Sequence, residues 1–247
     1  MNIITLSGGI SSAWVADWVL ENVDKNAILY FNDTKWEHED LYRFLSDLEK
    51  YWGKKIYNDS DGRSPEDVFY DQNMLANNRV PLCSRILKAD RLQKFAKPGD
   101  VCFFGIDGTE AHRAVRIKQI YDGIGIKTRF PMLETETSKE QVLKWLESSG
   151  IKIPKMYELG FTHNNCSGGC VRAGKRQWLH LLKTLPEVFA ERERVENDFM
   201  GYSGKKATYM KDMSLSELRK ISDMQIELDF TDDETATECI GICNLEN

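Results

Sequence analysis

Hydrophobic and polar residues alternate along the first half of the chain in blocks whose lengths suit strands and helices in turn. Short apolar runs are bounded by polar or turn-forming residues, as in the buried strands of a parallel sheet. Longer stretches carry apolar residues at helical spacing. The predicted strands cover Ile3–Leu6, Ala27–Phe31, Lys54–Tyr57 and Val101–Ile106, and the predicted helices cover Ser12–Glu21, Glu39–Tyr51, Pro65–Met74 and Ser84–Ala96. This alternation predicts an α/β fold with a doubly wound parallel sheet that is covered by helices on both faces.

The pattern changes after Phe130-Pro131. A helix is predicted over Thr137–Glu147, with Ser138 as its cap. A loop rich in glycine, asparagine and cysteine follows, then a basic amphipathic stretch around Trp178, and the chain ends in a polar segment. We therefore expect an α/β core over residues 1–135 and a helical, cysteine-bearing region over residues 136–247.

The composition is that of an ordinary globular protein, since 41% of the 247 residues are hydrophobic and the formal net charge is −6. An acidic balance argues against a broad nucleic-acid-binding surface, although a local basic cleft stays open. No apolar run approaches the roughly 18 residues that a membrane span needs, and the first residues do not resemble a secretory signal. We expect no membrane association and a cytoplasmic location. There, six cysteines are more typical of metal ligands, catalytic thiols or core residues than of disulfides.

The first predicted strand runs directly into Ser7-Gly8-Gly9, and Ser11-Ser12 opens the helix that follows. Glycines let backbone N–H groups approach an anion closely, and the start of a helix favours negative charge. The stretch is neither a Walker motif nor a dinucleotide-binding G-x-G-x-x-G. Two interpretations stay open at this point, a cradle for phosphate groups and a simple strand–helix turn that is capped by a serine.

Four further stretches follow LSGGISS in order. They are Phe31-Asn32-Asp33-Thr34 with Glu39, Pro81-Leu82-Cys83-Ser84-Arg85-Ile86-Leu87-Lys88, Phe104-Gly105-Ile106-Asp107 with Glu110 and Arg113, and Pro131-Met132-Leu133 through Tyr157–Phe161 to Cys166 and Cys170. The LSGGISS stretch itself resembles the S-G-G-x-[DST]-S loop of the PP-loop ATP pyrophosphatases, the adenine nucleotide alpha hydrolase group. The others resemble the D-T-G…E, C-C-x-x-x-K, G-x-R-x-x-E-x-x-R and P-L…C-x-x-C segments of its phosphoadenylylsulfate (PAPS) reductase branch. The resemblance covers residues 3 to 170 and implies a Rossmann-type core of the PP-loop kind that binds adenine nucleotides.

The resemblance implies where a nucleotide, either ATP or a PAPS-like or APS-like sulfonucleotide, would bind. Its phosphates would lie on Ser7, Gly8, Gly9, Ser11 and Ser12. ATP-cleaving relatives have Asp where this chain has Ser11, which counts against Mg²⁺-assisted release of pyrophosphate. Asp33 and Thr34 would meet the ribose or adenine edge, unless they cap the next helix. Gly105 belongs to the strand end that resembles the family's third motif.

Several phosphate charges in a cleft require cations. The candidates are Arg85, Lys88, Arg113 and Arg116, in two pairs that each share a helix face. Glu110 would orient Arg113, or would favour a helix start as an acid. The alternative for the four cations is that they are solvated surface charges.

The cysteines fall into three groups. Cys102 lies in an apolar strand and is most simply a core residue. Cys83, Cys166 and Cys170 form a reasonable thiolate set for a 4Fe–4S cluster or zinc, with Cys239, Cys243, a substrate atom or nothing as the fourth ligand. Leu82 stands where cluster-containing relatives have another cysteine, so unligated or redox-active thiols are the alternative. Glu238-Cys239 resembles the E-C-G-[LI]-H segment that carries the nucleophilic cysteine of PAPS reductases, or it is an idle thiol near the terminus.

Three functions are compatible with these residues. The first is an oxidoreductase of the PAPS reductase family that acts on sulfur in an adenylyl or sulfonucleotide substrate, with Cys239, Arg85, Lys88 and Arg113 in the catalytic machinery. The second is an ATP-dependent, adenylylating sulfurtransferase with an iron–sulfur cluster. The third is a nucleotide sensor without catalysis. Expected partners are the small-molecule nucleotide, a thioredoxin-like reductant and a second copy in a homodimer, while nucleic acid is open but not favoured.

Overall fold

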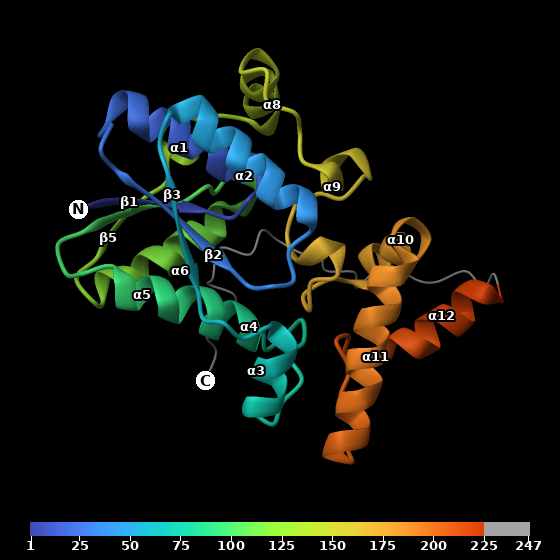
Figure 1. Ribbon diagram of the computed structural model, residues 1–247. Helices are drawn as coiled ribbons and strands as arrows, with labels where there is room; N and C mark the ends of the chain where they lie inside the picture. Colours follow the sequence, from blue (N-terminus) through green and yellow to red (C-terminus); the bar gives the residue numbers. More distant parts are fainter. Residues whose placement is uncertain (225–247) are drawn as a thin grey trace.

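The computed structural model describes residues 1–224 of the chain, which form a parallel sheet with helices on both faces and a helical part beside it (Figure 1). The predicted Cys239 and Cys243 sites lie outside the described residues. The strands are β1 (Asn2–Leu6), β2 (Ile28–Asp33), β3 (Ile56–Ser60), β4 (Val101–Phe103) and β5 (Lys127–Arg129). All four pairings are parallel, and the spatial order is β3-β2-β1-β4-β5. The predicted doubly wound parallel sheet is therefore confirmed.

Alternate residues of the strands supply two separate hydrophobic layers. Ile4 and Leu6 of β1 pack with helices α1 (Ile10–Asn22) and α2 (Glu39–Trp52) on one face. Ile3 packs on the other face with α5 (Asp90–Phe95) and α6 (Ala111–Asp122). After β1 the chain adds β2 and β3 along one edge of that strand, and it then crosses to add β4 and β5 along the other edge. The order of strands therefore reverses at β1. Ligands of such sheets bind beyond the carboxyl ends of the strands at this point.

Local structure departs from the predicted elements in three places. The helix predicted over Ser84–Ala96 is divided into α4 (Leu82–Ser84), a π-helical turn η1 (Arg85–Ala89) and α5. The strand predicted over Val101–Ile106 ends at Phe103, because residues 104–107 leave the sheet. The edge strand β5 was not predicted, since its sequence Lys-Thr-Arg carries no apolar signal.

The remaining elements connect these layers or follow them. Ser138 caps the predicted helix α8 (Lys139–Ser148) through a capping box with Gln141, which satisfies N–H groups at the helix start. Helix α8 packs on α1 in the same hydrophobic layer, so this first part of the region after residue 135 contacts the sheet domain. The other elements are α3 (Pro65–Asp71), η2 (Gly108–Glu110), α7 (Pro131–Glu134), α9 (Lys155–Glu158), η3 (Cys166–Gly168), α10 (Lys175–Thr184), α11 (Pro186–Ser203) and α12 (Leu215–Asp223).

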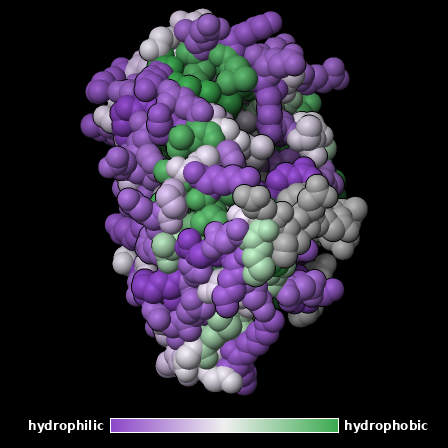
Figure 2. Space-filling model, turned by 90° about the vertical axis from the view of Figure 1, so that its right-hand side faces the viewer, coloured by the Kyte–Doolittle hydropathy of each residue, from purple (hydrophilic) through white to green (hydrophobic). Residues whose placement is uncertain are grey.

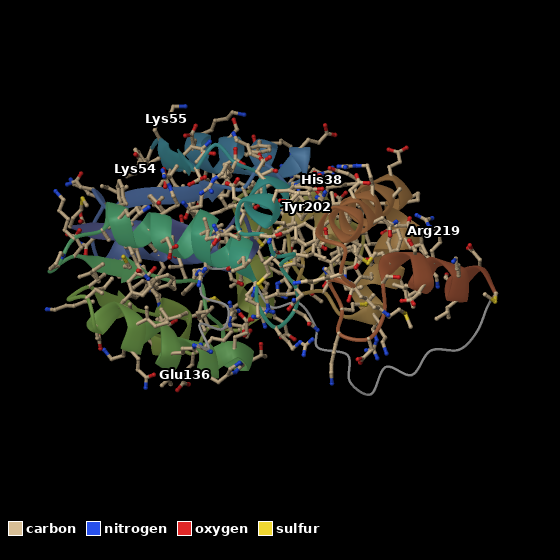
Figure 3. The ribbon with its side chains drawn as sticks, turned by 90° about the horizontal axis from the view of Figure 1, so that it is seen from below. His38, Lys54, Lys55, Glu136, Tyr202 and Arg219 are labelled. Atoms are coloured by element: carbon tan, nitrogen blue, oxygen red, sulfur yellow. The ribbon has the colours of Figure 1, made fainter. Side chains whose placement is uncertain are left out.

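Helices α10, α11 and α12 form a second hydrophobic core together with α3, α4 and the cysteine loop. Seen from below, this helical part lies beside the sheet and its flanking helices, with Arg219 of α12 on the outer side (Figure 3). Its core contains Trp178, Phe189 and Tyr209, and it also buries the three cysteines that were predicted to act together.

On the face that Figure 2 shows, hydrophobic residues form small patches separated by hydrophilic ones. Among the helices of residues 1–224, none has both the length and the apolar character needed to cross a membrane.

Candidate functional site

The turn between β1 and α1 has the geometry of an anion-binding loop. Gly8 has a φ of +80°, which favours glycine. The Ser12 hydroxyl accepts a hydrogen bond from the Ser7 N–H (3.1 Å) and donates to the Gly9 carbonyl (2.9 Å), which folds the loop onto the helix. The N-cap residue of helix α1 is Gly9, not a serine, and it has no side chain with which to cap the helix. The interpretation of this turn as a serine-capped connection is therefore wrong, and the phosphate-cradle interpretation agrees with the geometry.

The end of β4 lies directly against this loop. A Cβ atom at Gly105 would lie 2.8 Å from the Ser12 backbone, so only glycine permits this approach. The next turns bring Glu110 and Arg113 to the same edge of the sheet, where they form a buried ion pair. The contact by which Glu110 was predicted to orient Arg113 is thus present, whereas Arg116 is half-buried.

A small pocket opens beyond the carboxyl ends of β1 and β2. Thr5 and Ser7 line it from β1 and the loop, Tyr30 and Asn32 line it from β2, and Lys88 lines it from η1. Lys88 is buried, while Arg85 is half-buried on the same π-helical turn. A π-helical turn changes the directions of its side chains relative to an α-helix and frequently marks a functional site.

Asp33 and Thr34 end β2 at this edge, and both are buried. Asp33 accepts hydrogen bonds from the Lys35 N–H (2.9 Å) and the Tyr42 hydroxyl (2.8 Å). Neither residue caps the following helix, because the cap of α2 is His38, whose ring accepts from the Asp40 N–H. Of the two alternatives for Asp33 and Thr34, the helix cap is wrong.

Glu37 joins the carboxyl end of β2 to the cysteine loop, which carries Cys166 and Cys170. Its carboxylate accepts hydrogen bonds from the Thr34 hydroxyl (3.0 Å), from the Cys166 N–H (2.7 Å) and from Lys88 Nζ (3.4 Å). The side chains of the Glu37–Lys88 pair are almost completely buried, with exposures of 0% and 7%. Glu39, which matched the family motif in the sequence, is exposed, so Glu37 is the acid at the site.

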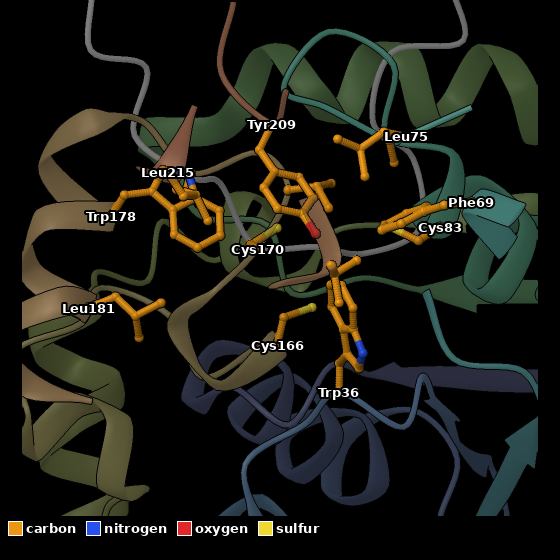
Figure 4. Packing of buried hydrophobic residues seen from close by; sticks show 14 of the residues in the cluster. Trp36, Phe69, Leu75, Cys83, Cys166, Cys170, Trp178, Leu181, Tyr209 and Leu215 are labelled. Carbon is orange, nitrogen blue, oxygen red and sulfur yellow. The ribbon is translucent and has the colours of Figure 1, made fainter. Parts of the chain in front are cut away.

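Cys83, Cys166 and Cys170 line one small buried pocket, as predicted from their spacing in the sequence (Figure 4). Thr34 and Lys88 lie in the same pocket wall. The loop turns sharply here, since Cys166, Ser167 and Gly168 all have positive φ. A hydrogen bond with the Cys170 sulfur raises the pKa of Cys166 well above its ordinary value, and burial acts in the same direction.

The three buried thiols are donors of the kind that an iron–sulfur cluster or a zinc ion requires. Within residues 1–224, no three His, Cys, Asp or Glu side chains are arranged around one point as ligands of a metal ion. In an iron–sulfur cluster each thiolate binds its own iron, so the ligands stand around a larger body. Buried cysteines from two segments around one pocket fit that donor chemistry. Cys102 is a core residue as predicted, because its side chain is fully buried in a hydrophobic cluster, and this burial raises its pKa to about 12.

Other contacts at the site were not predicted. The Asn164 side chain donates to the Gly8 carbonyl (2.8 Å), and the Tyr157 hydroxyl accepts from the Ile10 N–H (3.4 Å). Both residues are more than 140 positions away from the loop that they touch. No local pattern in the sequence signals such contacts, because they depend on how the second half of the chain folds back onto β1.

The geometry agrees with a comparison against known families. Residues 1–172 match the family model described as the phosphoadenosine phosphosulfate reductase domain, whereas no curated protein matches the chain significantly. The match contains the phosphate loop, Gly105, the ion pair of Glu110 with Arg113, and all three cysteines of the buried pocket. It ends before α10, so most of the helical part lies beyond it. Because the match covers well over half of the chain, this protein belongs to the phosphoadenosine phosphosulfate reductase domain family, within the adenine nucleotide alpha hydrolase superfamily.

Proposed function

We propose that this chain is an oxidoreductase that acts on the sulfur of an adenylyl sulfate-type nucleotide. The observation that carries the proposal is the position of Lys88. Its side chain lies in the wall of the pocket beyond β1 and β2 and also in the wall of the cysteine pocket. A nucleotide on the phosphate loop would therefore place its charged end next to buried sulfur atoms.

The chain's own residues would divide the work as follows. The backbone N–H groups of Gly8, Ser11 and Ser12 would bind phosphate at the start of α1, and Arg113, held by Glu110, would add positive charge. Lys88 would neutralise the charge of the sulfonyl group that is transferred to the thiolate. The Cys239 thiolate would attack sulfur, forming an S-sulfonated cysteine and releasing the adenosine phosphate. A second thiol would then release sulfite and form a disulfide, which a thioredoxin-like dithiol reduces with two electrons.

Cys83, Cys166 and Cys170 would hold an iron–sulfur cluster, with Cys243 as a candidate for the fourth ligand. When bound, such a cluster supplies a redox centre beside the site, and an iron without a fourth cysteine can accept a sulfur ligand. Mg²⁺ has a smaller role in this proposal, because the loop carries the Ser11 hydroxyl where ATP-cleaving relatives have a carboxylate.

The second candidate is an ATP-dependent adenylylating sulfurtransferase, which modifies a small molecule or a nucleic acid. The observation in its favour is the set of three cysteines around one pocket beside the nucleotide edge. In that reaction ATP would adenylylate an oxygen of the substrate with loss of pyrophosphate, and sulfur would then displace AMP.

Two product assays on the anaerobically purified protein distinguish these functions. With APS or PAPS and a dithiol, the reductase is expected to release sulfite. With ATP, the sulfurtransferase is expected to release pyrophosphate once its acceptor is present. Release of sulfite from neither sulfonucleotide would overturn the first proposal, and nucleotide binding without either product would favour the sensor.

The role of Lys88 is tested by Lys88→Ala. Because Lys88 borders both pockets, we expect the variant to lose at least tenfold in kcat/KM for the sulfonucleotide. Charged contacts to a transferred group are typically worth about 1.5–3 kcal/mol. Lys94→Ala is the matched control, since Lys94 is exposed on the adjoining helix α5. Equal activity of the two variants would remove Lys88 from the mechanism.

A further inference from the structure

The helical part beyond the family match packs a buried arginine against the loop that carries Cys166 and Cys170. Arg192 of α11 is only 2% exposed. Its guanidinium carbon lies 3.6 Å from the centre of the Trp36 ring, and the Trp36 carbonyl accepts a hydrogen bond from Ser167 of the cysteine loop. Arg192 is thus held between the segment that carries Glu37 and the loop that carries Cys166 and Cys170.

Two buried N–H groups of this arginine have no hydrogen-bond acceptor. Within the described residues, Nε and Nη1 lack an acceptor of suitable geometry. The Glu191 carboxylate lies 3.1 Å from Nη1 and offsets part of the charge, but Glu191 is half-exposed and its geometry is not that of a hydrogen bond. Buried cations without acceptors are strongly unfavourable, so an anionic or sulfur acceptor is expected at this point.

The direction of these groups is set by the loop. A Cβ atom at Gly169 would lie 3.2 Å from Arg192 Nε, so the arginine packs against the backbone between Cys166 and Cys170. The cysteine loop is therefore the segment against which these N–H groups pack.

Tyr209 is a second buried donor beside the same pocket. It is fully buried, and its hydroxyl has no hydrogen-bond partner among residues 1–224. In Figure 4 this hydroxyl points into the space that is bordered by Trp36, Cys166, Cys170 and Cys83. Burial raises the pKa of Tyr209 well above its ordinary value.

We propose that Arg192 and Tyr209 donate hydrogen bonds to the sulfur atoms of the cluster held by Cys83, Cys166 and Cys170, and so set its reduction potential. The inference rests on the cluster in the proposed function. It assigns to the region after residue 172 a part of the sulfur site that the family match does not contain. Both side chains are positioning residues, since they would act on the nucleotide only through the cluster.

Anaerobic redox titration of the purified protein, followed by visible absorption and electron paramagnetic resonance, tests the inference. Hydrogen bonds to cluster sulfurs favour the reduced form, which is more negative. We expect a more negative potential in Arg192→Gln and a smaller shift of the same sign in Tyr209→Phe. Arg192→Lys keeps the charge but loses the planar donor fork, so its potential should lie between those of the native protein and Arg192→Gln.

Arg219→Gln is the matched control. Arg219 also lies over an aromatic ring of the helical part, 4.9 Å from the centre of Phe189, but it is paired with Glu193 on the outer side (Figure 3). The cluster of the Arg219→Gln variant should have the same reduction potential as that of the native protein. If Arg192→Gln does not fold, Tyr209→Phe, which keeps the ring, carries the test.

The outcomes separate the two proposals. Native protein without stoichiometric iron and sulfide would overturn the cluster and this inference together. Arg192 and Tyr209 variants that contain the cluster and have the native reduction potential would overturn the inference alone and leave the proposed function standing. Shifts in the Arg192 and Tyr209 variants, with none in the Arg219 variant, would support it.

Discussion

At the scale of single residues, Glu37 is the most connected side chain of the site. Its two carboxylate oxygens hold the end of β2, the π-helical Lys88 and the backbone of Cys166. A buried carboxylate is tolerated where hydrogen-bond donors surround it. Removal of that charge therefore withdraws the carboxylate partner from a buried cation and loosens the cysteine loop.

Glu37→Gln is expected to lower the free energy of unfolding by about 3 kcal/mol, which is typical when a buried ion pair loses one partner. Chemical denaturation of the two proteins under identical conditions measures the difference. Glu39→Gln changes the same residue type two positions further on, where the side chain is exposed, and should stay within about 0.5 kcal/mol of the native protein. Equal losses in both variants would contradict the assigned role.

The sequence allowed several of these positions to be predicted and not others. Ser7, Gly8 and Thr34 follow strands with clear apolar patterns, so their place at the edge of the sheet could be inferred. Glu37 could not be distinguished from Glu39, because both stand in one polar run and only the folded chain turns one of them inward. Arg192 carried no signal, since a helical arginine is ordinarily exposed.

At the scale of elements, α11 holds the segment before α12 through one buried acid. The Glu196 carboxylate accepts hydrogen bonds from the Tyr209 N–H (2.9 Å) and the Leu215 N–H (2.6 Å). Burial raises the pKa of Glu196 from 4.5 to about 7, although the two N–H donors act in the opposite direction. The attachment of Tyr209 to the cysteine pocket therefore depends on a group that titrates near neutral pH.

The pH dependence of stability follows from that pKa. Because the pKa is higher in the folded state, the folded protein holds this proton more tightly than the unfolded chain. Its contribution to stability is fully present below about pH 4.5 and is lost as the pH rises through about 7, by up to about 3 kcal/mol. Urea denaturation between pH 4.5 and 8 should show this slope in the native protein.

Glu196→Gln should remove that slope, and Glu187→Gln, an exposed acid on the same helix, should keep it. A slope unchanged in Glu196→Gln would assign it to other groups.

The elements themselves were predictable in proportion to their apolar pattern. Helix α2 begins at the predicted residue, and β1, β2 and α8 lie within two residues of their predicted bounds, because burial on one or both faces leaves a strong periodic signal. The edge strand β5 and the π-helical turn had none. Their conformations are fixed by neighbours, by pairing with β4 and by packing of η1 against β2.

At the scale of the whole molecule, hydrogen bonds join the cysteine loop to the carboxyl ends of β1 and β2. Asn164 donates to the Gly8 carbonyl on one side of the contact, and Cys166 donates its N–H to Glu37 on the other. Two distinct hydrophobic cores therefore meet at polar contacts around the loop between β1 and α1. A nucleotide that orders this loop should also order the cysteine loop, because the hydrogen bonds fix both backbones together.

Hydrogen exchange measured with and without an adenine nucleotide tests this coupling. We expect added ATP or APS to slow exchange at residues 166–170 as well as at residues 7–13 in the native protein. Asn164→Ala should keep the second effect and lose most of the first, with nucleotide affinity lowered about fivefold, as for a buried hydrogen bond worth about 1 kcal/mol. Asn22→Ala removes a similar side-chain contact, to the Trp18 carbonyl at the exposed end of α1, and should change neither. Protection at residues 166–170 that survives in Asn164→Ala would show that the two loops respond to the nucleotide independently. The coupling through the Asn164 hydrogen bond would then be wrong.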